Sequence, residues 1–387
     1  MEGPNPYRPG AGIAPLVLAG RDEAITTAKN ALTNVLRGAP QRPIAFYGLR
    51  GVGKTVVLNE VQTNASNQGV VFEHIEISEN DNFKNVIMQK VRKILYRLDT
   101  LAAAKGKVLE AFKALKAISL AFPGGPEIKV DLEAPEGTAD SGNFQSDLTD
   151  LMVILGEAAK EKGKAVCFFI DELQYLKEED FEAIIASSHR VSQRTLPIQF
   201  ICAGLPQILA KAADAKSYAE RQFNFFELGR IKEPADKEAI EGPLIGTGVT
   251  IEVAATKEVL RVTGAYPYFI QEYGSILFEK LEHGVITAGF VKENEKVFYD
   301  KLDESFYRSR WERATDMEKK YMRAMAMIGA GPYKSAEVAE KMQRRQDSIS
   351  PLRGGLIHKG FIYSPSHSLV DFTVPGFDEY LKRAGEI

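Results

Sequence analysis

The chain has 387 residues, of which 44% are hydrophobic and 26% are charged, values near the average for globular proteins. At roughly 150 residues per domain, this length predicts two or three domains and excludes a chain that is disordered throughout. Lys and Arg number 49 against 52 Asp and Glu, which gives a net charge of −3. This balance excludes a basic field over the whole chain, so any surface for nucleic acid must be local.

The cysteine content and the apolar segments bear on the location of the protein. Cys167 and Cys202 lie within apolar runs, which indicates reduced thiols instead of a disulfide framework. No stretch reaches the roughly 18 apolar residues of a membrane span, and residues 1–20 lack the apolar segment of a signal peptide. We therefore expect a cytoplasmic protein that does not enter a membrane. Residues 1–15 hold four prolines and three glycines and are expected to form a flexible tail.

Apolar residues at helical spacing over residues 25–36 predict a first helix. Five short apolar or alternating runs, separated by helical patterns, then predict strands at residues 43–48, 70–77, 166–170, 198–203 and 223–228. Strands that alternate with helices form a mostly parallel sheet with helices on both faces. We therefore predict an α/β domain over residues 16–230.

The interval between the second and third strands is long, and we predict an insertion over residues 99–145. Within it, residues 118–122 and 127–132 flank a Pro-Gly-Gly-Pro turn, a pattern that indicates a β-hairpin. Residues 231–315 show helical patterns, which predict a helical lid and a long linker helix over 291–313. Residues 316–387 predict three helices (316–328, 335–342 and 347–359) followed by two short strands, the order of a winged helix.

Residues 48–55, GLRGVGKT, match the pattern G-x-x-x-x-G-K-[ST] and stand between a predicted strand and a predicted helix. In this pattern the glycines allow backbone N–H groups to face phosphate oxygens at a helix N-terminus. Lys54 is expected to reach the β- and γ-phosphates, and the Thr55 hydroxyl to hold Mg²⁺. The predicted nucleotide contacts here are Gly48, Leu49, Arg50, Gly51, Val52, Gly53, Lys54, Thr55 and Val56.

A second motif, VCFFIDE at residues 166–172, is an apolar strand that ends in two carboxylates. Asp171 is expected to hold the metal ion and Glu172 to polarise the attacking water. The two motifs together predict a Mg²⁺-dependent ATPase with Lys54 and Glu172 as catalytic residues. The fourth strand ends in Cys-Ala-Gly at 202–204 and offers no side chain that could sense the γ-phosphate.

Arg221 stands immediately before the fifth predicted strand, and two interpretations of it remain open. As a finger supplied in trans to the nucleotide of a neighbouring copy, it would raise the rate of hydrolysis and would imply a homo-oligomer. As a surface residue, it would form an ion pair with Glu220 or Glu227.

Four segments together resemble AAA+ ATPases, in the branch shared by origin-recognition initiators and STAND signalling ATPases, including archaeal-type ATPases with a winged-helix tail. They are LAGRDE at 18–23, the phosphate loop, IDE at 170–172 and GAYP at 264–267. The resemblance implies that Gly20 and Arg21 lie beside the adenine and that the lid closes over it through the segment around Pro267. No Arg follows Pro267 to touch the γ-phosphate, which favours a slow switch over rapid turnover.

The third helix of a winged helix enters the DNA major groove. Between residues 334 and 359, six Lys or Arg stand against three acidic residues, a local positive balance suited to phosphate contact. The predicted contacts to double-stranded DNA are Lys341, Arg344, Arg345, Arg353 and Lys359. The alternative is a STAND-like assembly ATPase whose winged helix binds a protein partner. The basic run over residues 308–323 is interpreted as a solvated helix face.

Overall fold

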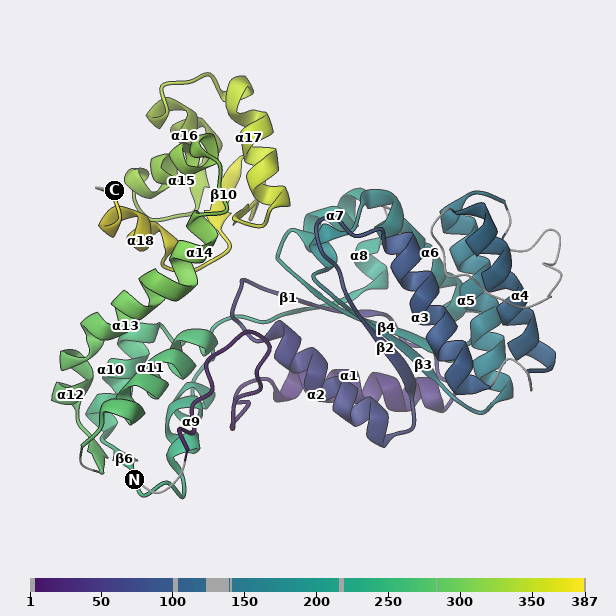
Figure 1. Ribbon diagram of the computed structural model, residues 1–387, viewed down its shortest axis with the longest axis horizontal. Helices are drawn as coiled ribbons and strands as arrows, with labels where there is room; N and C mark the ends of the chain where they lie inside the picture. Colours follow the sequence, from purple (N-terminus) through teal and green to yellow (C-terminus); the bar gives the residue numbers. More distant parts are fainter. Residues whose placement is uncertain are drawn as a thin grey trace. The chain divides into compact units, whose positions relative to one another are not determined.

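The computed structural model of the chain describes residues 4–99, 104–122, 139, 141–215, 219–282 and 284–385 (Figure 1). It divides into two compact units. The sheet unit comprises Glu23–Tyr47 and Val57–Glu227, and the lid unit comprises Met1–Asp22, Gly48–Val56 and Leu228–Ile387. Within the described ranges, no helix is long and apolar enough to cross a membrane.

The sheet unit is built on five parallel strands in the order β2-β3-β4-β1-β5. Continuous apolar runs bury β3 and β4 completely, as expected for central strands that are covered on both faces. The predicted α/β fold with a parallel sheet is confirmed. The strands are β1 (Ile44–Tyr47), β2 (Val71–Glu76), β3 (Val166–Asp171), β4 (Ile198–Gly204) and β5 (Asn224–Glu227).

Helices cover both faces of this sheet (Figure 1). One face carries α1 (Asp22–Leu36) and α2 (Lys54–Asn67), and the other carries α3 (Phe83–Leu98), α5 (Phe144–Glu161) and α6 (Glu178–Gln193). Ile75, Phe168 and Phe200 project from the sheet into the second of these layers, where they join one buried apolar cluster with the helices. Two short helices, α7 (Ile208–Ala215) and α8 (Ala219–Gln222), lie between β4 and β5 in the chain.

The β-hairpin predicted within residues 99–145 is wrong in its first strand. Residues 118–121 form the last turn of a helix, α4 (Gly106–Ala121). Its buried side chains Val108, Phe112, Leu115 and Ile118 recur at helical spacing, and the helix packs against α5. A short apolar run at the end of a helix does not differ in composition from a strand. The rest of the predicted hairpin, from residue 123 to 132, lies outside the described residues.

The helical part of the lid unit follows β5, and the single linker helix predicted over residues 291–313 is divided into shorter elements. A π-helical turn over Leu302–Tyr307 separates two of these helices. Elsewhere in the lid, two short strands, β6 (Thr250–Ile251) and β7 (Val285–Ile286), pair in parallel. The helices are α9 (Ala235–Glu241), α10 (Val253–Thr263), α11 (Pro267–Lys280), α12 (Ala288–Glu293), α13 (Glu295–Lys301) and α14 (Arg308–Trp311).

The start of the chain packs against this lid, in contrast to the flexible tail expected over residues 1–15. Tyr7 is 3% exposed, and its hydroxyl donates to the carbonyl oxygen of Ile240. The ring occupies the space left by the missing side chain of Gly274, and Asn5 donates to Ser275. The packing of Tyr7 against Gly274 therefore holds a proline-rich segment on the lid.

The C-terminal part of the lid unit, residues 316–385, contains the three predicted helices and a small antiparallel sheet of order β8-β10-β9. This arrangement is consistent with a winged helix. The helix α17 continues through Pro351. The elements are α15 (Asp316–Ile328), β8 (Tyr333–Lys334), α16 (Ser335–Lys341), α17 (Gln346–His358), β9 (Ile362–Tyr363), β10 (Leu369–Phe372) and α18 (Phe377–Arg383).

Candidate functional site

The phosphate loop begins directly after β1 and runs into the first turn of α2. Gly53 has a φ of +90°, a backbone conformation that residues with a side chain rarely adopt. A methyl group on Gly48 would lie 2.0 Å from the carbonyl oxygen of Leu228, so the chain leaves no space there for a side chain. Glycine is required at both positions, and the loop presents its amides at a helix N-terminus, where an anion is stabilised.

Lys54 is folded back over this loop. Its ammonium group donates to the carbonyl oxygens of Gly48 at 3.0 Å and Leu49 at 2.9 Å, and the residue is only 8% exposed. The loop backbone therefore holds a positive charge beside the N-terminus of α2. Together they form a site suited to phosphate oxygens.

Gly20 and Arg21 lie against the same loop. Arg21 is buried, and its guanidinium donates to the carbonyl oxygens of Val52 at 3.1 Å, Gly229 at 2.5 Å and Gly20 at 3.0 Å. Burial lowers the pKa of Arg21 below its ordinary value. The structure thus gives Arg21 a role in fixing the loop to the segment after β5, and its place beside the adenine stays a prediction.

The lid contacts the loop through the residues on either side of Pro267, which is the first residue of α11. The hydroxyl of Tyr266 donates to the carbonyl oxygen of Arg50, and the amide of Tyr268 donates to the carbonyl oxygen of Gly51 at 3.2 Å. Proline suits the first position of a helix, where its missing N–H costs nothing. The predicted lid segment therefore lies on the loop, while a contact from Pro267 to the nucleotide is untested.

The C-terminal domain also contacts the loop. The amide of Arg50 donates to the carbonyl oxygen of Thr373 at 3.0 Å, directly after β10. Thr373 is itself buried, and its hydroxyl is bonded to the carbonyl oxygens of Gly360 and Phe361. One residue of the phosphate loop thus links the lid to the C-terminal domain by its two backbone polar groups.

Arg310, which the sequence places in a solvated basic face, is instead largely withdrawn from water beside the loop. Its guanidinium lies 4.2 Å from the centre of the Phe306 ring and donates to the Phe306 carbonyl oxygen. Burial, together with the positive charges of Arg50 and Arg313, lowers the pKa of Arg310 to about 10. Several guanidinium groups that repel one another in a partly dehydrated place favour a bound anion.

The predicted catalytic carboxylates lie at the end of β3. Asp171 is 3% exposed, and its Oδ1 accepts from the amide of Glu172 at 2.8 Å. Glu172 has a φ of +56°, a left-handed backbone that costs about 1 kcal/mol or more outside glycine. Because β1 and β3 run parallel on either side of β4, the chain leaves both strands at the same edge of the sheet. Ligands of parallel sheets bind at this edge.

Gln174 is a residue that the sequence reasoning missed. Its amide nitrogen donates to the Glu172 carboxylate, and its amide oxygen accepts from the amide of Leu205 at 3.0 Å. The sequence predicts no polar side chain at the end of β4, and Gln174 supplies one there from the 3-10 turn that follows β3. The only signal in the sequence is a glutamine two residues after the carboxylates.

Arg221 lies exposed in α8. Among the described side chains, no ion pair joins Arg221 to Glu227, and the side chain of Glu220 lies outside that set. Two other arginines have internal partners. Arg194 pairs with Glu157 at 2.8 Å, and Arg230 donates to the carbonyl oxygen of Gly264 at 2.8 Å.

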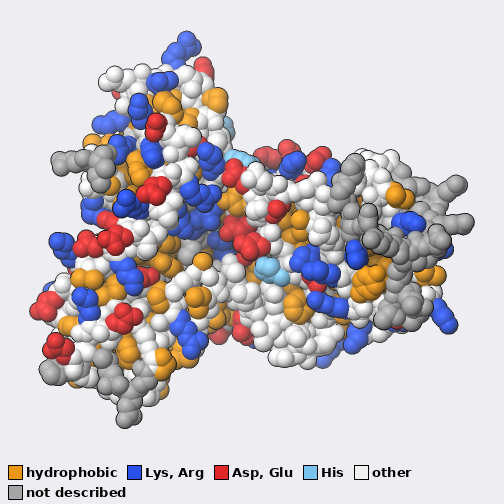
Figure 2. Space-filling view, in the orientation of Figure 1, with side chains coloured by type: hydrophobic (Ala, Val, Ile, Leu, Met, Phe, Trp, Pro, Cys, Tyr) orange, Lys and Arg blue, Asp and Glu red, His pale blue; other side chains and the backbone are white. Residues whose placement is uncertain are grey.

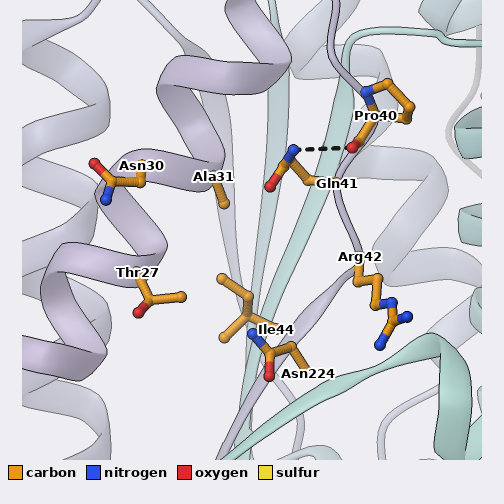
Figure 3. Close-up of a pocket in the computed structure, with 8 residues that line it drawn as sticks. All are labelled: Thr27, Asn30, Ala31, Pro40, Gln41, Arg42, Ile44 and Asn224. Atoms are coloured by element: carbon orange, nitrogen blue, oxygen red, sulfur yellow. Dashed lines mark hydrogen bonds between the residues drawn. The ribbon is translucent and has the colours of Figure 1, made fainter.

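A cavity of about 380 Å³ lies at the opposite edge of the sheet (Figure 3). Ile44 and Asn224, the first residues of β1 and β5, contribute to its wall together with Thr27 and Asn30 of α1. Gln41, also in the wall, donates to the carbonyl oxygen of Pro40. Since the cavity adjoins the amino ends of the strands, it is not the nucleotide site.

The five predicted DNA contacts differ in their surroundings. Lys341, Arg344 and Arg345 are exposed around the turn between α16 and α17, and Figure 2 shows many Lys and Arg side chains on the surface of this domain. Arg353 donates to the Ser364 hydroxyl at 2.9 Å, and Lys359 pairs with the buried Glu318 at 2.9 Å. Three of the five are therefore exposed, with Arg345 also 3.9 Å from Asp347, and two form contacts within the domain.

Comparisons with known proteins agree with this organisation. Residues 17–201 match the family model of the AAA ATPase domain, and residues 304–381 match a family described as a domain of unknown function, DUF8462. No curated protein matches the chain.

The chain is similar to several solved structures. The Walker-type ATPase PABY2304 of Pyrococcus abyssi is 14% identical, with 94% of this chain and 95% of that chain covered and a TM-score of 0.52. Cdc6p from Pyrobaculum aerophilum is 12% identical, with 97% of each chain covered and a TM-score of 0.48. The Aeropyrum pernix Orc1 protein, in complex with DNA, is 11% identical, with 95% and 94% covered and a TM-score of 0.45. Residues 17–201 are thus similar to AAA ATPase domains, and the likeness to the Walker-type ATPase is one of fold.

Proposed function

We propose that the protein is a slow Mg²⁺-dependent ATPase whose nucleotide state controls the binding of duplex DNA by its C-terminal domain. The observation that carries this proposal is the pair of backbone hydrogen bonds of Arg50. Its carbonyl oxygen accepts from Tyr266 of the lid, and its amide donates to Thr373 of the C-terminal domain. A nucleotide that shifts the phosphate loop thereby acts on both at once.

The residues present fit a nucleoside triphosphate with a magnesium ion. Lys54, Arg50 and Arg310 supply positive charge at the loop, and Thr55 and Asp171 would hold the metal ion. Among the described residues, no group of three or more His, Cys, Asp or Glu could hold a metal. This suits Mg²⁺, which takes few protein ligands and shares its coordination with phosphates and water.

Hydrolysis would use the chain's own groups in distinct roles. Mg²⁺·ATP, when bound, supplies the phosphoryl group and a polarised leaving group. The ammonium of Lys54 would stabilise the charge on the phosphates, and the carboxylate of Glu172 would accept a hydrogen bond from the attacking water and orient it. Gly20 and Arg21 would border the adenine, with Pro267 above it in the lid. These assignments give nucleotide binding to the phosphate loop and the lid, and hydrolysis to the end of β3.

The C-terminal domain is proposed to bind DNA through Lys341, Arg344 and Arg345, which form the exposed set. The test is the affinity for a labelled duplex, measured by fluorescence anisotropy over a range of salt concentrations with ATP and with ADP. Contact with three phosphates predicts a slope of log affinity against log salt of about −3. Replacement of all three residues by alanine should bring the slope close to zero. Lys334→Ala is the matched control, because that exposed lysine is already paired with Glu337.

Two results of this experiment would change the proposal. DNA that binds with a steep salt slope but leaves ATP affinity unchanged would contradict the coupling, because linkage requires each ligand to alter the affinity of the other by the same factor. A flat slope, with a C-terminal domain that still responds to ATP, would favour the alternative, a STAND-like assembly ATPase that binds a protein partner.

Arg221 is proposed to act in trans within a homo-oligomer. Arg221→Ala chains mixed with Lys54→Ala chains should then regain part of the turnover that each lacks alone, since some interfaces pair an intact loop with an intact finger. No recovery in a mixture that is shown to co-assemble would favour a surface role for this exposed arginine.

A further inference from the structure

The side chain of Gln174 joins the ends of β3 and β4. It lies on the 3-10 turn Leu173–Tyr175, directly after Glu172. Its amide oxygen accepts from the backbone amide of Leu205 at 3.0 Å. A backbone N–H can only donate, so the oxygen must face Leu205. The amide nitrogen therefore faces the other way, and it donates to Oε2 of Glu172.

Gln174 is held in place on all sides. The residue is 6% exposed, and its own carbonyl oxygen accepts from the ammonium of Lys211 at 3.1 Å. If either hydrogen bond of the Gln174 side-chain amide were broken, a buried polar group would lose this partner. Other rotamers of Gln174 are therefore disfavoured. The position of the amide is thus set by the protein and not by solvent.

The end of β4 is shaped to receive this side chain. A methyl group on Gly204 would lie 3.0 Å from the amide oxygen of Gln174 and 2.8 Å from Ile208. Any larger residue there would compete with Gln174 for the same space. The lack of a side chain at Gly204 therefore leaves the space that the buried side chain of Gln174 occupies.

The bond from Gln174 offsets a repulsion at Glu172. Glu172 follows Asp171 directly, and two neighbouring carboxylates repel one another unless a donor or a positive charge offsets the repulsion. The donated bond from Gln174 does this and also restricts the rotation of the Glu172 side chain. A carboxylate fixed in this way loses less entropy when it orients a reacting water.

We propose that Gln174 is a positioning residue, which aims the carboxylate of Glu172 and ties it to the end of β4. This inference rests on the proposed function, because it assumes that Glu172 orients the attacking water. It adds that a displacement of the β4 end would reach Glu172 through the side chain of Gln174.

Two variants separate this role from a structural one. Gln174→Met keeps the length of the side chain and removes both hydrogen bonds, whereas Gln174→Glu keeps an acceptor for Leu205 and turns the donor into a like charge. If Gln174 aims Glu172, both variants bind ATP within about twofold of the wild type. We expect kcat to fall about 10-fold in Gln174→Met and further in Gln174→Glu. If Gln174 only supports Leu205, Gln174→Glu should be the milder of the two, which would overturn the proposal.

A double-mutant cycle completes the test. In the Glu172→Gln background, Gln174→Met should lower kcat no further, because both changes act through one carboxylate. Gln193→Met, at an exposed glutamine of α6, is the matched control and should keep the wild-type kcat. Thermal unfolding establishes that each variant is folded.

The failure of this inference and that of the proposed function are distinguishable. Wild-type kcat in folded Gln174→Met, with turnover still abolished by Glu172→Gln, would overturn the positioning role alone. Full turnover in Glu172→Gln would overturn the hydrolytic assignment on which the inference rests.

Discussion

The phosphate loop and the end of β3 provide the two halves of the proposed ATPase, and they are built differently. At the loop the backbone makes most contacts: its carbonyl oxygens hold Lys54, and the main chain of Arg50 bonds to the lid and to the C-terminal domain. At the end of β3 the contacts are made by side chains, and the amide of Gln174 donates to the carboxylate of Glu172. The comparison indicates that changes at the loop affect binding and coupling, while changes at β3 affect turnover.

The largest expected effect divides these two functions. Lys54→Ala removes the positive charge at the loop and should weaken ATP binding by at least about 100-fold, since charge-assisted contacts to phosphate are lost. Glu172→Gln should keep ATP affinity within a few-fold and lower kcat by at least about 100-fold, because it removes only the water-orienting carboxylate. Calorimetric titration with ATP and a phosphate-release assay measure the two effects.

A lysine outside the site provides the control. Lys29→Ala removes a partly exposed ammonium that pairs with Glu60 at 3.0 Å, and it should leave both quantities unchanged. Equal ATP affinity in the wild type and in Lys54→Ala would contradict the assignment of the loop, and with it the comparison.

Arg310 sharpens the comparison on the side of the loop. Arg310→Met keeps much of the side-chain volume and removes a partly dehydrated guanidinium, so ATP affinity should fall about 10-fold while the pH and metal dependence of turnover persist. Arg308→Met is the matched control, because Arg308 stands on the same helix, is exposed and pairs with Glu312 at 2.9 Å. Equal ATP affinities in the two variants would show that Arg310 plays no part in the site.

Much of the fold could be predicted from the sequence because its signals are local. The apolar runs of β3 and β4 are long enough to indicate buried strands. The glycines of the phosphate loop indicate backbone conformations that other residues rarely adopt, and the structure contains such conformations there. The first helix of the sheet unit shows the predicted apolar stripe, with Ile25, Ala28, Leu32 and Val35 all buried. In each of these cases the information lies within about 15 residues of chain.

What was missed depends on partners that are distant in the chain. Arg310 has the same neighbours in sequence as the exposed Arg308, and only the approach of the loop and of Phe306 withdraws it from water. Gln174 gains its role from Leu205 and from the empty space at Gly204. Tyr7 is ordered by Gly274, far along the chain. A single sequence carries no signal for such pairings. The strand predicted at residues 118–122 has a different cause, because a short apolar run at the end of a helix resembles a strand.

A smaller effect is expected where the loop meets the lid. Tyr266→Phe removes the hydroxyl that donates to Arg50 and leaves that carbonyl oxygen without this donor, at a cost of about 1 kcal/mol. The factor by which ATP changes DNA affinity should fall up to about fivefold, while ATP still binds.

Trp311 can report this change, because it directly follows Arg310 and has Lys319 and Arg323 at 5.4 and 5.0 Å from its ring centre. ATP should shift its emission in the wild type, less in Tyr266→Phe and not in Lys54→Ala. A full shift in Lys54→Ala would show that the signal does not come from nucleotide at the loop.

The smallest expected effect concerns acid, which should act on the two units in opposite directions. In the sheet unit, burial raises the pKa of Asp180 to about 6, partly opposed by Lys84, against an ordinary value of 3.8. In the lid unit, burial raises the pKa of Glu318, but hydrogen bonds from Thr315 and Lys359 outweigh it, and the pKa lies below its ordinary value of 4.5.

These shifts fix the sign of the pH dependence. Between about pH 4 and 6 the folded protein keeps the proton of Asp180 that the unfolded chain has released, so the free energy of unfolding falls as pH rises. Glu318 has the opposite effect. Its contribution to the free energy of unfolding is complete above its ordinary pKa of 4.5 and is lost as the pH falls below that value. Asp180→Asn should therefore stabilise the protein at neutral pH and have no effect below about pH 4, and Glu318→Gln should destabilise it at neutral pH. Urea unfolding at several pH values measures both. If Asp180→Asn is less stable than the wild type at neutral pH, the attraction between the Asp180 carboxylate and Lys84 outweighs the cost of burying the charge. The contrast between the two units would then disappear.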